Sequence, residues 1–117
     1  MGAETCKPCH ERAHAAWAGS RHAASFRDLE KDGRVHDPDC VSCHVTGFPA
    51  ESGYAGQGAR EPLANVGCES CHGPGGEHAA NPAKKPPGDA KAACATCHTP
   101  EHSPKYDPER YAAAIRH

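Results

Sequence analysis

Four short segments of this chain each place two cysteines and a histidine at the same spacing. Two residues separate the cysteines, and the histidine follows the second cysteine directly. We call them motif 1 (6–10), motif 2 (40–44), motif 3 (68–72) and motif 4 (94–98). Their cysteines are Cys6, Cys9, Cys40, Cys43, Cys68, Cys71, Cys94 and Cys97, and their histidines are His10, His44, His72 and His98. This spacing is typical of covalent haem attachment, because two such thiols can add to the two vinyl groups on one porphyrin edge.

Other cysteine chemistries must be weighed against this one. Paired cysteines also build zinc ribbons, redox-active dithiols and disulfide frameworks. None of these needs a histidine after every second cysteine, and histidine makes up only 10 of the 117 residues. We therefore predict four covalently bound haem c groups, with each motif histidine as an iron ligand, and keep zinc binding as a distant alternative.

Six histidines lie outside the motifs and are candidates for the second axial ligands of the four irons. They are His14, His22, His36, His78, His102 and His117. The single methionine is Met1, close to motif 1, so ligation by methionine is nearly excluded. Ligation by two histidines favours low reduction potentials, because methionine is the ligand that raises them.

The position of each candidate limits which iron it can reach. His14 follows His10 by one helical turn and therefore lies on the same side of the same haem. The same argument separates His78 from motif 3 and His102 from motif 4, so second ligands must come from distant segments. We expect His22, His78 and His117 to be ligands. His36 is the candidate for the second axial ligand of the fourth haem, although His14 or His102 could also provide that ligand. One of these histidines could instead bind the haem of another subunit.

The elements that position these groups are helices and loops. Alanine-rich and capped segments predict helices at about 9–18, 20–31, 89–97 and 108–117, the last starting at Asp107 and Pro108. Glycine and proline predict loops at 47–60 and 79–90. No alternating pattern predicts a strand.

The composition leaves little material for an apolar core. Leu, Ile, Val and Phe total 9 of 117 residues, while Gly and Pro total 23. Chains with less than about 20% of these large apolar residues rarely close a core. We therefore expect a single domain (1–117) that is mainly α with extensive loops. It would be a small multihaem cytochrome c fold organised around four covalent haems, without a conventional hydrophobic core.

Charge and hydropathy exclude several classes of partner. No run of 18 apolar residues suggests a membrane span, and no basic cluster suggests nucleic-acid binding. The formal net charge is −2, and the propionates of four haems would lower it to roughly −6. A redox partner with a basic docking patch is therefore favoured. We expect an exported protein, periplasmic or extracellular, whose signal peptide is absent from this numbering.

Residues 40–48 (CVSCHVTGF) and 66–75 (VGCESCHGPG) closely resemble the tetrahaem cytochrome c-554 family. The surroundings of Trp17, His22 and His117 are also similar to it. The resemblance implies an electron carrier linked to hydroxylamine oxidoreductase in nitrifying bacteria, with closely stacked haem pairs and distal ligands at His22, His78 and His117. In the best-known member the second haem is five-coordinate, whereas here His36 stands just before motif 2 and could close that site.

Three functions fit these features. The first is electron transfer through closely spaced haems, without enzymatic activity. The second is a subunit of an extracellular cytochrome filament, in which haems stack across subunits and one histidine is shared. The third is a reductase of a small nitrogen or oxygen species at an open second haem. We rank it last because no acid–base residues gather beside motif 2 in the sequence.

Overall fold

The computed structural model describes all 117 residues as short helices joined by long loops, without a β-strand. The elements are η1 (Ala3–Thr5), α1 (Glu11–Ala18), η2 (Arg21–Ala24), α2 (Ser25–Asp32), α3 (Pro38–His44), α4 (Cys68–His72), α5 (Gly76–Ala80), α6 (Ala90–Cys97) and α7 (Pro108–Ala114). The predicted mainly α architecture with extensive loops is confirmed.

The four predicted helices correspond to α1, to η2 with α2, to α6 and to α7. Three helices were missed: α3, α4 and α5. Helices α4 and α5 have only five residues each, too few to show a helical repeat of apolar positions. Helix α3 has seven residues, as α7 does, and begins with the same Asp-Pro pair, a signal that the sequence analysis did not use. Motifs 2 and 3 therefore coincide with helices of their own, and α5 reaches into the start of the predicted loop 79–90.

Aspartate caps begin three of the helices. The side chain of Asp37 accepts a hydrogen bond from the backbone N–H of Asp39 at the start of α3. Asp89 does the same for α6, and Asp107 for α7. An aspartate there satisfies N–H groups that have no partner within the helix. These caps determine where the helices that carry motifs 2 and 4 begin.

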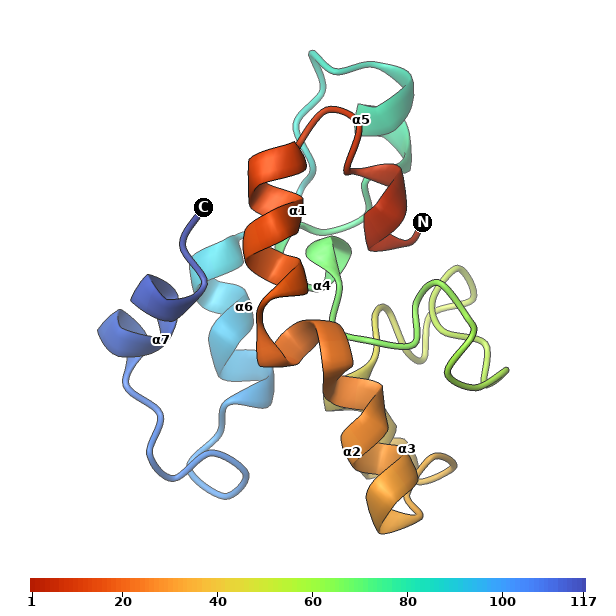
Figure 1. Cartoon of the computed structure of the whole chain (residues 1–117), viewed down its shortest axis with the longest axis vertical. Coiled ribbons are helices and arrows are strands. Elements are labelled where there is room, and N and C mark those ends of the chain that lie inside the picture. The colour runs from red at the N-terminus through yellow and green to blue at the C-terminus, as the bar shows by residue number, and fades with distance from the viewer.

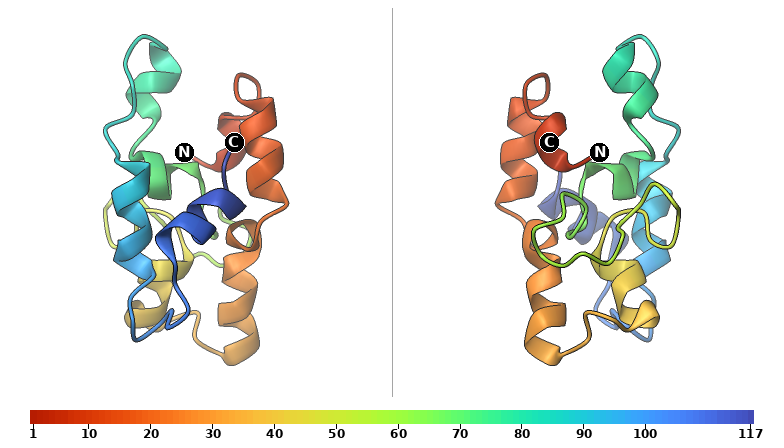
Figure 2. Two further views of the ribbon diagram at one scale, coloured as in Figure 1. Left: turned by 90° about the vertical axis from the view of Figure 1, so that its left-hand side faces the viewer. Right: turned by 90° about the vertical axis from the view of Figure 1, so that its right-hand side faces the viewer.

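The helices form two columns, seen best from the sides (Figure 2). One column holds α1 above η2 and α2, and the other holds α5, α4, α6 and α3, with α7 between them. The columns meet where α2 packs on α3, and within the second column α4 packs on α6. Figure 1 shows the same elements face-on, and both figures place the C-terminus beside α1. The radius of gyration is 13.8 Å, so all four motifs lie within a small volume.

A small apolar cluster lies between α2, α3 and the loop that follows. Its buried members are Phe26, Leu29, Val41, Val45, Tyr54 and Ala64. The prediction of no conventional core therefore needs correction at this one place, because the few large apolar residues are concentrated here rather than spread along the chain. Elsewhere few side chains are shielded from solvent, and only 11 of the 117 residues are buried in total.

Hydrogen bonds from three distant segments hold the backbone just before motif 3. The indole of Trp17 donates to the carbonyl of Val66 at 2.8 Å, and the N–H of Val66 donates to the Ser25 hydroxyl at 3.0 Å. The Thr46 hydroxyl donates to the carbonyl of Asn65 at 2.6 Å. Ser25 and Thr46 are buried. Buried polar groups must be paired to be tolerated, so this network links α1, α2 and the end of motif 2 to motif 3.

None of the helices has the length and apolar character needed to cross a membrane.

Candidate functional site

Three pairs of histidine rings lie close together at tilted angles, and each pair joins a motif histidine to a histidine from a distant segment. The distances between ring centroids are 5.8 Å for His10 and His78, 6.1 Å for His98 and His22, and 5.9 Å for His72 and His117. A metal–imidazole bond is about 2 Å long, so two imidazoles on opposite sides of one metal ion have centroids about 6 Å apart. The observed spacing fits two axial ligands of one iron.

Four histidine rings, three from these pairs and that of motif 2, are oriented by hydrogen bonds at their Nδ1 atoms. The contacts are His44 to the Ser25 carbonyl at 2.9 Å, His78 to the Lys84 carbonyl at 2.7 Å, His98 to the Ser103 hydroxyl at 3.0 Å and His117 to the Ile115 carbonyl at 3.0 Å. A carbonyl can only accept, so Nδ1 carries the proton in those three cases. That tautomer leaves Nε2 unprotonated and free to bind a metal.

Three paired histidines are biased toward the neutral form. Burial, together with the nearby His98, lowers the pKa of His22. Burial lowers the pKa of His72 as well, with smaller effects from His117 and His10, and burial alone lowers the pKa of His98. Only neutral imidazole binds metal, so this environment favours ligation.

His44 of motif 2 differs from the other motif histidines because the structure pairs no second ring with it. His36, the predicted partner, is exposed and precedes α3, whereas His44 ends that helix. A seven-residue helix separates its ends by about 10 Å. The structure therefore does not bring His36 to the ring of His44.

The rings of the other two candidates, His14 and His102, likewise form no pair with a motif histidine ring. His14 is buried against Trp17, and its Nε2 lies 2.9 Å from a carboxylate oxygen of Glu4. His102 is exposed. Of six candidates, the structure thus brings His22, His78 and His117 to motif histidines and leaves the other three elsewhere.

The cysteines show which motifs are neighbours. Burial, with a contribution from the adjacent Cys6 thiol, raises the pKa of Cys68 to about 11. Burial also raises the pKa of Cys71, where Cys94 contributes. Motifs 1 and 3 therefore adjoin, as do motifs 3 and 4.

Motif 4 also adjoins motif 2. Burial raises the pKa of Cys97, and the neighbouring Cys43 thiol adds to this rise. The four motifs thus follow one another in space in the order 1, 3, 4, 2. All eight cysteines are free thiols, and nowhere do three or more His, Cys, Asp or Glu side chains converge as in a zinc site.

Two tyrosines that the sequence analysis did not single out enclose the ring of His98. Tyr106 stacks on it at 5.2 Å with 15° between the planes, and Tyr111 meets it edge-on at 5.0 Å. The loop after motif 4 and helix α7 bring them there. Nothing in their spacing pointed to this contact, because it depends on how α7 folds back.

A close backbone contact fixes the end of motif 3. The N–H of Gly88 donates to the carbonyl of His72 at 2.8 Å. A Cβ at Gly88 would lie 2.3 Å from the carbonyl carbon of His72, closer than non-bonded atoms approach. Only glycine lets the loop 81–88 cross at this point.

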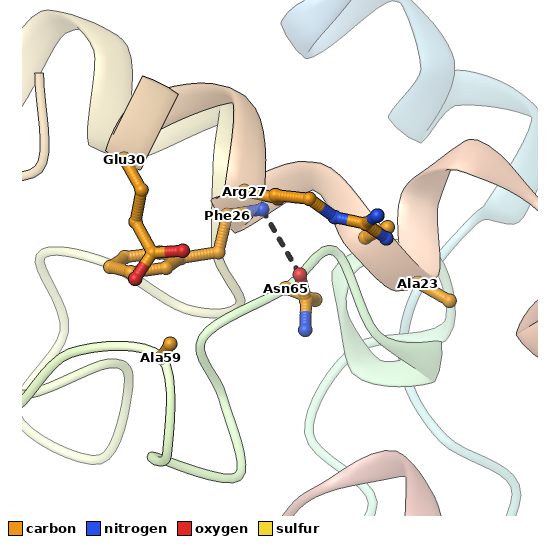
Figure 3. A pocket seen from close by; sticks show the side chains of 7 residues that line it. Ala23, Phe26, Arg27, Glu30, Ala59 and Asn65 are labelled. Carbon is orange, nitrogen blue, oxygen red and sulfur yellow. Dashed lines mark hydrogen bonds between the residues drawn. The ribbon is translucent and has the colours of Figure 1, made fainter. Parts of the chain in front are cut away.

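A surface pocket of about 310 Å³ lies beside the segment that carries His22. Ala23, Phe26, Arg27, Glu30 and Asn65 are among its lining residues (Figure 3). The backbone N–H of Phe26 donates to the Asn65 side chain at 3.0 Å. The charged groups of Arg27 and Glu30 extend in different directions from α2, so the pocket presents no assembled acid–base pair.

Comparison with known proteins gave two matches. The family model described as "Cytochrome c554 and c-prime" matches residues 5–73, a range that contains motifs 1 to 3. Cytochrome c-554 of Nitrosomonas europaea is 34% identical over 89 residues, an alignment that covers 63% of this chain and 38% of that protein. The chain thus matches well under half of the relative's length. No solved structure matched.

Proposed function

Because this chain belongs to the cytochrome c554 and c-prime family, a family of c-type haem electron carriers, we propose that it transfers electrons through four covalently bound haem c groups. The eight motif cysteines would hold the haems as thioethers, two on each. In every motif the cysteines are three positions apart, so they face the same side of a helical turn. When bound, haem supplies a one-electron iron couple, whose potential the protein sets through ligands, burial and hydrogen bonds.

The observation that carries this proposal is the pairing of histidine rings about 6 Å apart. We assign His10 with His78 to the iron of motif 1, His72 with His117 to that of motif 3, and His98 with His22 to that of motif 4. The two histidines of each pair come from segments that are distant in the sequence, so each iron would link those two segments. Two imidazoles on each of these irons favour low potentials.

The order of the motifs supports a route for electrons. Thiols of motifs 1 and 3, of 3 and 4, and of 4 and 2 are neighbours. Haems attached at neighbouring thiols would lie edge to edge within a molecule whose radius of gyration is 13.8 Å. Electrons would then pass between motifs 1 and 2 through motifs 3 and 4.

The partners and the location follow from charge and chemistry. With propionates added, a net charge near −6 favours a redox partner with a basic patch. We propose an exported, periplasmic or extracellular protein that exchanges electrons with such partners and performs no catalysis of its own.

A second function is favoured by one observation, the absence of a second ring at His44. An iron held there by His44 alone could bind a small nitrogen or oxygen species and reduce it. Alternatively, the exposed His36 of another copy could close the site, as in a filament. A high-spin ferric signal in a monomer would support the open site, and a low-spin signal that depends on protein concentration would support sharing.

The experiment that tests the proposed function is a haem count per chain. Intact mass under denaturing conditions, with an alkaline pyridine haemochrome spectrum, should give four covalent haems. The C40A/C43A double variant should give three. A wild-type chain without covalent haem, or with bound zinc, would contradict the proposal.

A further inference from the structure

Ser25 lies between two of the proposed haem ligands. It is buried, at 7% exposure, and is the first residue of α2. Its hydroxyl lies 2.8 Å from the carbonyl oxygen of His44 and 3.0 Å from that of His22. Its own carbonyl oxygen accepts the hydrogen bond from Nδ1 of His44 at 2.9 Å. One residue therefore contacts the backbone at two ligands and the ring of one of them.

The Ser25 hydroxyl both donates and accepts hydrogen bonds. A hydroxyl has one hydrogen to donate and two lone pairs to accept. It can donate to only one of the two carbonyls at a time, and it accepts from the N–H of Val66 at 3.0 Å. Because the group is buried, its removal would leave that N–H without a partner. The peptide of Ser25 is thus held from three sides.

Two different haem sites meet at this residue. His44 belongs to motif 2, and His22 is paired with His98 of motif 4. Motifs 2 and 4 adjoin through Cys43 and Cys97. A carbonyl that accepts from Nδ1 orients the imidazole and makes its other nitrogen a stronger donor to the metal. Movement of the Ser25 peptide would therefore change His44 directly and His22 through the same segment.

We propose that Ser25 is a positioning residue that couples the ligand geometry of the haems at motifs 2 and 4. The inference rests on the proposed function, since it needs haem at both motifs. Ser25 does not touch iron. It holds the carbonyl that orients His44 and the turn that presents His22, so one hydroxyl sets the environment of two irons at once.

Ser20 offers a matched control. Its hydroxyl also donates to the carbonyl three residues earlier, that of Trp17, at 2.6 Å, but makes no hydrogen bond to a motif residue. The variants S25A and S20A therefore remove the same kind of local bond. S25T keeps a hydroxyl at the tested position, and S25V has the shape of threonine without it.

The test is a redox titration of the haem-loaded variants, together with the proton NMR signals of the haem methyl groups in the ferric state. S25A should change the reduction equilibrium of two of the four haems by about threefold, which is about 30 mV for one electron. Two of the four sets of methyl signals should move. S20A should change neither readout, and S25T should resemble the wild type.

The outcomes separate this inference from the proposed function. Four haems in S25A with no change, or with an equal change at all four, would overturn the role of Ser25 and leave electron transfer untouched. Fewer than four haems in the wild type would refute the proposed function itself. If S25A does not accumulate, S25V compared with S25T replaces it, and a difference confined to two haems is again required.

Discussion

The imidazole rings of His10 and His78 lie 5.8 Å apart between centroids, although one precedes α1 and the other lies on α5. These helices belong to opposite columns of the molecule (Figure 2). The other two histidine pairs are likewise drawn from segments far apart in the sequence. Ligation through these pairs would connect parts of the chain that few apolar contacts hold together.

The first prediction concerns this pair. The H78A variant should lose the second ligand of the motif 1 iron, so one low-spin ferric signal should be replaced by a high-spin signal in electron paramagnetic resonance. The potential of that haem should also change, because axial ligands set it.

The matched control for His78 is H102A, since His102 is exposed and faces no motif histidine. Its spectrum should equal that of the wild type. Loss of a low-spin signal in H102A, with none lost in H78A, would show that the pairing is wrong.

The second prediction concerns the close contact between the backbone of Gly88 and the carbonyl group of His72. G88A should force the loop away from the carbonyl of His72, because the added Cβ has no room. Such overpacking costs about 1–3 kcal/mol. Thermal denaturation should show a lower midpoint and altered absorption of the motif 3 haem.

The control for Gly88 is Gly76, in α5, where an added Cβ would meet nothing within 4 Å. G76A should leave stability unchanged or raise it by up to about 1 kcal/mol, since alanine favours a helix. Equal destabilisation by G88A and G76A would show that the close contact of Gly88 with His72 is not the cause.

The third prediction concerns the tyrosines around His98. Y106A should expose the imidazole of the motif 4 haem to water, which stabilises the more highly charged ferric form and so lowers the potential. Y106F keeps the ring that stacks at 5.2 Å and should retain the wild-type potential. Voltammetry compares the two variants, and a rise in potential for Y106A would contradict the argument.

The fourth prediction is that the haem-free chain does not fold. Only 11 of 117 residues are buried, and the one apolar cluster lies at one end, between α2 and α3. That is too little apolar area to offset the conformational entropy lost on folding. A chain with all motif cysteines replaced by alanine should show no near-UV dichroism and no cooperative thermal transition, and a sharp transition would refute the prediction.

The sequence predicted four helices because alanine-rich runs and caps such as Asp107 are local signals. It missed α4 and α5, which have five residues each and show no periodicity. It also missed α3, although Asp37 and Pro38 begin that helix as Asp107 and Pro108 begin α7. The apolar cluster was missed for another reason: composition counts residues but does not show that Phe26, Val41 and Tyr54 meet.

The candidate site, like the fold, was predictable from the sequence only in part. Fixed spacing made the motifs visible, and the argument that His78 cannot serve the haem of motif 3 led to distant partners. Which histidine meets which motif was not predictable, since it depends on how the two columns face each other. The roles of Ser25 and Tyr106 were also hidden, because a buried serine or a stacked tyrosine has no signature in the sequence.

The most direct test of the account is an iron anomalous diffraction map from crystals of the haem-loaded protein. We expect four iron positions in each chain. Three should lie between the imidazoles of His10 and His78, His72 and His117, and His98 and His22, and the fourth should lie beside His44. Iron positions that join other histidines, or fewer than four of them, would contradict the account.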